Sequence, residues 1–216
     1  MQDMDCVTGI ILKAEPIGEY DRRLVILTKE KGKISAFAKG ARRPNSKLIA
    51  ATNPFCYGIF YIYAGRNSYT IRDITIKDYF EALRTDYIAA YYGIYFLEIA
   101  DYYGRENNDD IQMLNLLYLA LKALIHNAYD NKLVMAIYEI KIIVVNGEFP
   151  GYFKELSSKE SILHAIQFIV ETPLNKLFSF AVEAQILREL LKYSRNYQKQ
   201  CIAKNFKTLE ILKTLA

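Results

Sequence analysis

The chain has 216 residues, of which 52% are hydrophobic and 24% are charged. This composition is that of a globular protein with a core, and it excludes an intrinsically disordered chain. The net charge of +4 is unevenly spread, because residues 1–78 carry 13 Lys/Arg and 8 Asp/Glu whereas residues 79–216 carry 15 and 16. The basic excess therefore belongs to the first third of the chain.

The cysteines and the apolar segments bear on the compartment of the protein. Cys6, Cys56 and Cys201 are far apart and form no CxxC pair, which supports neither a disulfide framework nor a zinc ribbon. The first six residues lack the apolar core of a signal peptide. The most apolar segments, 89–97 and 114–121, are too short to span a bilayer. We therefore expect a cytoplasmic protein without a membrane association.

Residues 6–77 have the pattern of short strands separated by turns. The expected strands cover residues 7–14, 24–28, 34–39, 55–63 and 69–76. Turn residues lie between them, and Gly32 can supply a positive φ before the third strand. Because closure removes the exposed edges of so short a sheet, these strands predict a small closed barrel.

After Asp78 the apolar residues take helical spacing. The expected helices cover residues 79–103, 111–127, 132–145, 160–170 and 178–198. We interpret the tyrosines of the first helix (Tyr87, Tyr91, Tyr92, Tyr95, Tyr102 and Tyr103) as core and domain-interface residues. The predicted fold class is α+β, with a five-stranded β-barrel domain at residues 1–78 followed by an all-α helical domain at residues 79–216.

The strongest functional signal is the segment 22–47, which holds nine Lys/Arg and one acidic residue, Glu30. Two apolar runs of strand type interrupt the charge, so the segment belongs to a folded sheet rather than to a disordered tail. A basic surface fixed on a sheet is complementary to a polyanion, and nucleic acid is the commonest polyanion in a cell. The segment predicts a nucleic-acid-binding protein rather than an enzyme.

The expected third strand carries two different faces. Small apolar residues (Ile34, Ala36, Ala38) alternate with cationic, hydroxyl and aromatic residues (Lys33, Ser35, Phe37, Lys39). Lysines neutralise phosphates, a ring stacks on a base for about 1–3 kcal/mol, and the arginine pair in the following loop suits bidentate phosphate contacts. The candidate nucleic-acid-binding residues are Arg22, Arg23, Lys33, Phe37, Lys39, Arg42, Arg43 and Lys47.

Each of these signals has a structural alternative. Most runs of charge are solvated faces that keep a protein soluble, although the excess of cations in the segment 22–47 favours nucleic acid here. A second aromatic set shares one face of the expected fourth strand: Tyr57, Ile59, Tyr61 and Tyr63. This set either extends the stacking platform or packs against a neighbouring helix.

Signatures of catalysis and metal binding are scarce. The only histidines, His126 and His164, lie in helical contexts without Cys or carboxylate at metal spacing, so we expect structural or surface roles for both. The chain contains no GxxxxGKS/T, GxSxG or HExxH pattern. We therefore predict no catalytic residue, no metal, no cofactor and no small-molecule substrate.

The order of these segments resembles the bacterial RecO family of recombination mediators. The resemblance rests on residues 9–13 (GIILK), 18–22 (GEYDR), 24–28 (LVILT), 31–35 (KGKIS) and above all 38–44 (AKGARRP). Residues 54–58 (PFCYG), 138–141 (YEIK), 146–147 (NG) and 206–212 (FKTLEIL) are also similar. The likeness covers almost the whole chain.

The resemblance implies an N-terminal OB-fold and a C-terminal helical domain. It implies a DNA repair protein of the RecF pathway that binds single- and double-stranded DNA, anneals complementary strands and, with RecR, helps RecA load on DNA coated by single-strand-binding protein. The DNA-contacting region of the family corresponds to Lys33, Lys39, Arg42 and Arg43. The C-terminal tail of single-strand-binding protein is expected on the helical domain, at residues that the resemblance does not identify.

One departure from the family concerns zinc. Many members carry a CxxC…CxxC module after the helix that corresponds to residues 132–145. Residues 149–155 (FPGYFKE) pass directly toward the next helix without a cysteine. Zinc is therefore not predicted, and the function of that module is in doubt for this chain.

Two other functions would use the same basic face. One is an OB-type adaptor that binds acidic protein tails through charge complementarity. The other is an RNA-binding protein, which only a preference for the 2′-hydroxyl would separate from a DNA-binding one.

Overall fold

The computed structural model describes residues 4–126, 128–154, 156 and 159–215. The chain separates into two compact units, Met1–Thr85 with Leu97–Leu114, and Asp86–Phe96 with Asn115–Ala216. The first unit contains the strands, and the second contains most of the helices. Within the described residues, no helix is both long enough and apolar enough to cross a membrane.

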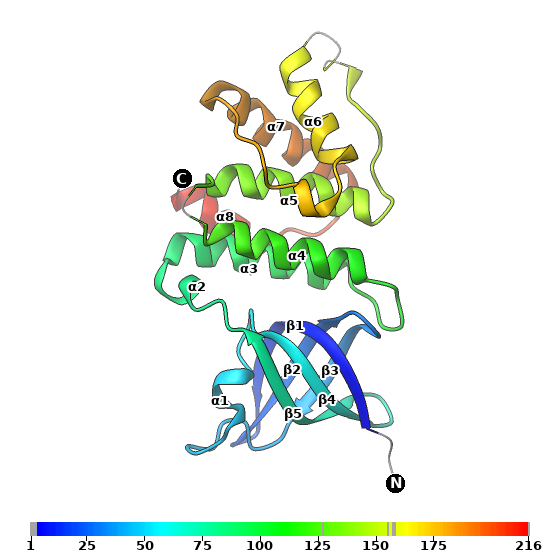
Figure 1. Ribbon diagram of the computed structural model, residues 1–216, viewed down its shortest axis with the longest axis vertical. Helices are drawn as coiled ribbons and strands as arrows, with labels where there is room; N and C mark the ends of the chain where they lie inside the picture. The colour runs from blue at the N-terminus through cyan, green and yellow to red at the C-terminus, as the bar shows by residue number, and fades with distance from the viewer. Residues whose placement is uncertain (1–3, 127, 155, 157–158, 216) are drawn as a thin grey trace. The chain divides into compact units, whose positions relative to one another are not determined.

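Five strands close a barrel in the first unit (Figure 1). They are β1 (Met4–Ile17), β2 (Asp21–Thr28), β3 (Gly32–Ala38), β4 (Tyr57–Ala64) and β5 (Tyr69–Asp78). The order around the barrel is β1-β2-β3-β5-β4, and all neighbours are antiparallel except β3 and β5. The predicted α+β class with an N-terminal closed barrel is confirmed. Strands β1 and β2 are longer than expected, because only Gly18, Glu19 and Tyr20 separate them.

The barrel interior is filled by the inward-facing side chains of the alternating strands. Its buried residues include Val7, Ile11, Leu24, Ile26, Ile34, Ala36, Ala38, Phe60, Ile62 and Ile71. Strand β1 departs from simple alternation, since Ile10, Ile11 and Leu12 are all buried. The register with β2 shifts between Ile11 and Lys13, as it does where a β-bulge inserts an extra residue and turns the chain.

The backbone of residues 105–107 pairs with the turn between β2 and β3. Lys33 N donates to the carbonyl oxygen of Arg105 at 2.9 Å, and Asn107 N donates to that of Lys31 at 2.9 Å. Gly32 has φ +63°, and a Cβ on it would lie 2.2 Å from the Arg105 oxygen. This position requires glycine for both its backbone conformation and its space.

The helices at Leu48–Ala51 and Lys207–Leu215 lie outside the predicted ranges, and the others differ from the predicted ones mainly at their ends. The named helices within the described residues are α1 (Leu48–Ala51), α2 (Ala82–Thr85), α3 (Tyr87–Tyr103), α4 (Ile111–Leu124), α5 (Asn131–Val145), α6 (Glu160–Glu171), a 3₁₀ turn (Leu174–Lys176), α7 (Ala184–Cys201) and α8 (Lys207–Leu215). The expected helix at 79–103 is divided, because Phe80 has φ +49° and the Asp86 carboxylate accepts a hydrogen bond from Ala89 N to begin α3. Tyr87, in the first turn of α3, is 78% exposed rather than a core residue.

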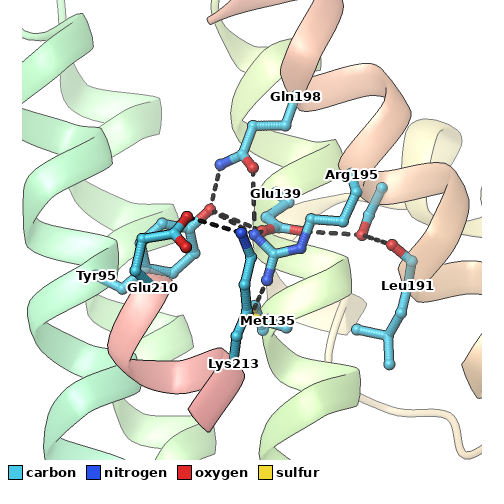
Figure 2. A network of polar contacts seen from close by, with 9 residues as sticks. Tyr95, Met135, Glu139, Leu191, Arg195, Gln198, Glu210 and Lys213 are labelled. Carbon is cyan, nitrogen blue, oxygen red and sulfur yellow. Dashed lines mark hydrogen bonds and ion pairs between the residues drawn. The ribbon is translucent and has the colours of Figure 1, made fainter. Parts of the chain in front are cut away.

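Helix α5 is the most deeply buried helix segment described in the second unit, and it carries a buried charge. The Glu139 carboxylate accepts hydrogen bonds from Tyr95 Oη at 2.7 Å and Ser194 Oγ at 2.7 Å, and pairs with Arg195 Nη1 at 2.9 Å (Figure 2). Burial raises the pKa of Glu139, and the Arg195 charge and these hydrogen bonds only partly offset it. The network links α3, α5 and α7 within this unit.

Candidate nucleic-acid interface

Strand β3 has the two faces that its sequence predicts. Ile34, Ala36 and Ala38 are at most 1% exposed, whereas Lys33, Ser35 and Phe37 are half-buried on the opposite face. Lys39 follows the strand's last residue and is exposed. The alternation confirms which side of the strand lies in the barrel and which side lies on its surface.

The outer position of Lys33 does not leave its charge free for a ligand. Its Nζ donates to the main-chain oxygen of Asp101 at 2.6 Å and pairs with Asp101 Oδ1 at 3.2 Å. Lys13 Nζ pairs with the other carboxylate oxygen at 2.7 Å. Burial alone would raise the pKa of Asp101, but the two lysines outweigh burial and lower it. Because Asp101 already compensates this charge, we leave Lys33 out of the proposed interface, and its role in binding phosphates stays a prediction.

Arg22 is also committed to the fold. Its Nη1 donates to the carbonyl oxygens of Ile49 and Thr52 at 3.1 Å each, to Thr52 Oγ1 at 2.8 Å and to Asn53 Oδ1 at 3.0 Å. Burial, and then the like charge of Arg42, lower the pKa of this guanidinium. These bonds hold the segment between α1 and β4, so we exclude Arg22 from the interface too.

Arg23 lies on the outer face, directly opposite Phe37 of β3. It is exposed, and its Nε donates to Ser35 Oγ at 3.0 Å. The other neighbour of Phe37 is Thr70 of β5. The half-buried Phe37 is therefore flanked by a cation on one side and a small hydroxyl residue on the other.

The loop after β3 is fixed by hydrogen bonds although its cations are exposed. Gly40 N donates to Asp21 Oδ1 at 2.7 Å, and Arg42 N donates to the carbonyl oxygen of Tyr20 at 2.8 Å. Arg42 Nη1 donates to the carbonyl oxygen of Gly18 at 3.3 Å. These hydrogen bonds order the backbone of the loop, and no ion pair neutralises its cations among the residues that the structure describes.

We call the exposed cations Arg23, Lys39, Arg42, Arg43 and Lys47, together with Phe37, the barrel basic surface. Six of the eight predicted residues belong to it. Sequence reasoning missed Tyr20, which is 40% exposed and has the Arg43 guanidinium 5.5 Å from its ring centroid. The β1–β2 loop that carries Tyr20 is one of the loops with which OB-folds bind oligonucleotides, and this could have drawn attention to it.

The tyrosines of β4 lie on the outer side of the barrel, beyond β5 from Phe37. Tyr57, Tyr61 and Tyr63 are half-buried and share the outer side of their strand, as predicted. Strand β5 lies between β3 and β4 in the barrel order. A whole strand therefore separates these rings from Phe37.

Groups suited to metal binding are absent from the part of the chain that the structure describes, which contains no cluster of three or more His, Cys, Asp and Glu side chains placed to hold an ion. His126 and His164 are both exposed. His126 accepts a hydrogen bond from Ala128 N through its Nδ1, a local contact after the end of α4.

Comparison with known proteins identifies relatives over most of the chain. The family described as "Recombination protein O N terminal" matches residues 1–80, and "Recombination protein O C terminal" matches residues 84–164. The DNA repair protein RecO of Acetivibrio thermocellus is 30% identical over 96% of both chains. The proteins of the same name from Clostridium perfringens and Alkaliphilus metalliredigens are 25% and 34% identical, over 95% and 66% of this chain and 96% and 58% of their own.

Proposed function

This chain belongs to the RecO family of DNA repair proteins, and on that premise we propose that it is a recombination mediator whose barrel basic surface binds DNA. The observation that supports the proposal is the loop between β3 and α1. Its cations are exposed while its backbone is bonded to the barrel at Asp21 and Tyr20. An ordered loop backbone reduces the conformational freedom that is lost when its cations meet phosphates.

The proposed mechanism is charge neutralisation followed by strand pairing. Arg23, Lys39, Arg42 and Arg43 contact phosphates, and Phe37 stacks on a base of a single strand. A strand whose phosphates are neutralised repels a second strand less, which allows complementary strands to meet and anneal. No step requires a bound nucleotide or a metal.

Partners are proposed on the ground of family membership. We infer that the protein acts with RecR and binds the C-terminal tail of single-strand-binding protein, so that RecA can load on coated DNA. The proposal assigns no residue of this chain to RecR or to this tail. The proposal also covers double-stranded DNA, whose phosphates suit the same cations.

The decisive experiment is a salt titration of single-stranded DNA binding. Replacing Lys39, Arg42 and Arg43 by Ala is expected to reduce the slope of log affinity against log salt by about 0.7 for each lost phosphate contact, or roughly 2 in all. Replacing Lys132 and Lys176, two lysines of the second unit, provides a control for altered net charge. An unchanged slope in the triple variant would remove the barrel basic surface from the interface.

The same variants separate the competing functions. An adaptor for acidic tails would bind an acidic peptide through these cations while showing no DNA binding at low salt. An RNA-binding protein would prefer a ribose oligonucleotide to its deoxyribose counterpart. A strand-annealing assay, with and without single-strand-binding protein, tests the mediator role itself.

A further inference from the structure

Residues 188–213 form a second basic segment. The net charge of residues 79–216 does not reveal it, because acidic residues elsewhere in this range balance its cations. Residues 188–213 hold seven Lys/Arg and two acidic residues, Glu189 and Glu210. Arg195 pairs with buried Glu139 and Lys213 pairs with Glu210 (Figure 2). The other five are exposed: Arg188, Lys192, Lys199, Lys204 and Lys207.

Three of these cations form a line on α7, which we call the α7 basic stripe: Arg188, Lys192 and Lys199. Their spacings of four and seven residues place them on one helix face, within a sector of about 40°. At about 1.5 Å rise per residue, the stripe is roughly 16 Å long. That length corresponds to about five nucleotides of a stacked strand.

A hollow of about 510 Å³ adjoins the stripe. Its lining combines two cations, two amides and two aromatic rings: Lys192, Lys199, Asn196, Gln200, Phe153 and Tyr193. Phe153 is half-buried and packs on Tyr193 and Tyr197, with ring centroids 5.7 Å and 4.5 Å apart. The aromatic residues are thus held in place by one another at the edge of a basic helix face.

We propose that the α7 basic stripe and this hollow bind a segment of single-stranded nucleic acid. Cations in a line along one helix face suit a chain of phosphates, and an aromatic side chain with neighbouring amides suits an unpaired base. An acidic peptide would pair with the lysines but has less use for the amides and rings. A free nucleotide could fill the hollow but would leave Arg188 unused.

This inference extends the proposed function, because a chain with a strand-binding surface on each unit can hold two strands at once. The two surfaces are defined by different residues in different units, so each can be removed separately. The inference predicts that nucleic acid remains bound, more weakly, when the barrel basic surface is neutralised.

The test uses the full chain and oligothymidylate. In the Lys39/Arg42/Arg43→Ala background, we expect residual binding whose salt slope falls by about 1.4 when Lys192→Ala and Lys199→Ala are added, at about 0.7 for each contact. The matched control is Lys132→Ala with Lys176→Ala, which is expected to leave the slope unchanged. The variant with Lys192→Arg and Lys199→Arg keeps both charges and should therefore keep the salt slope of the background variant. Thermal unfolding of each variant checks that the fold is intact.

Photocrosslinking identifies the residues that contact the bases, which a change in net charge alone would not alter. With an iododeoxyuridine-substituted strand, crosslinks are expected in peptides containing Phe153 or Tyr193, and they should disappear in the Lys192/Lys199→Ala variant. Crosslinks confined to the barrel, together with an unchanged slope, would overturn the inference. So would loss of acidic-peptide binding without any change in nucleic-acid binding.

The two proposals fail in different ways. If the barrel triple variant binds like the wild type while the Lys192/Lys199→Ala variant does not, the proposed role of the barrel fails and the α7 surface stands. The reverse result removes the α7 surface and leaves the proposed function in place.

Discussion

Lys33 Nζ lies 2.6 Å from the main-chain oxygen of Asp101 and 3.2 Å from its Oδ1, although Lys33 is an outward-facing residue of β3. The carboxylate also pairs with Lys13 at 2.7 Å. Two lysines of the barrel therefore share one acid from α3, within the first unit. Outward direction on a strand is thus not the same as availability to a ligand, and this distinction separates Lys33 from Lys39.

The first prediction compares those two lysines. Lys33→Ala is expected to leave the salt slope of single-stranded DNA binding unchanged, whereas Lys39→Ala lowers it by about 0.7. Lys33→Ala should instead lower the free energy of unfolding by about 1–2 kcal/mol, because Asp101 loses a partner in a part-buried site. Salt titration and urea unfolding measure the two effects. Equal loss of slope in both variants would return Lys33 to the interface.

The second prediction concerns acid stability. Because its two lysines lower the pKa of Asp101 in the folded state, the folded carboxyl binds a proton more weakly than the unfolded one, whose pKa is about 3.9. This contribution is present above the unfolded pKa and is lost as the pH falls through the folded pKa. The advantage of the wild type over Asp101→Asn should therefore shrink below about pH 4. Unfolding curves that stay parallel across this range would contradict the assignment.

Features that depend on residues close together in the sequence could be predicted, and contacts between distant residues could not. The faces of β3 were predictable, because alternation is a property of one strand. The Lys33–Asp101 pair was not, since 68 residues separate its members and no local pattern joins them. The charge of residues 79–216 taken together does not reveal the cations of α7, because acidic residues elsewhere balance them. Charge is informative over the length of one element rather than over a whole domain.

The third prediction distinguishes Arg22 from its neighbour Arg23. Arg22→Ala removes the donor that holds Ile49, Thr52 and Asn53. We expect a loss of about 2–3 kcal/mol in unfolding free energy, since part-buried acceptors lose a charged donor. Arg23→Ala should be nearly neutral for stability and should lower the DNA salt slope. Exchanged phenotypes for the two arginines would show that the exposed and committed residues have been misassigned.

The fourth prediction tests stacking on Phe37. Phe37→Ala is expected to weaken single-stranded DNA binding by about 1–3 kcal/mol without a change in salt slope, because the ring contacts a base rather than a phosphate. Phe37→Tyr keeps an aromatic face and serves as the control. Binding of duplex DNA should change little, since its bases are already stacked. A Phe37→Ala variant with normal affinity would limit the barrel basic surface to phosphate contacts.

The fifth prediction concerns the attachment of α7 to α5. Glu139→Ala leaves the Arg195 charge and the Tyr95 and Ser194 hydroxyls without their acceptor, and it is expected to cost about 3–5 kcal/mol. Lys199→Ala, an exposed change on the same helix, should cost almost nothing. Urea unfolding of both variants measures the difference.

The pH dependence of the Glu139 network gives this prediction a second readout. Burial raises the pKa of Glu139, so the folded state holds its proton more tightly than the unfolded state does. Stability relative to Glu139→Gln should therefore decline as the pH rises above the unfolded pKa of about 4.3, the opposite of the trend at Asp101. A wild-type advantage that instead grows with pH would mean that Arg195 and the two hydroxyls outweigh burial. In that case an ion pair between ionised Glu139 and Arg195 would fix α7, the helix that carries the α7 basic stripe.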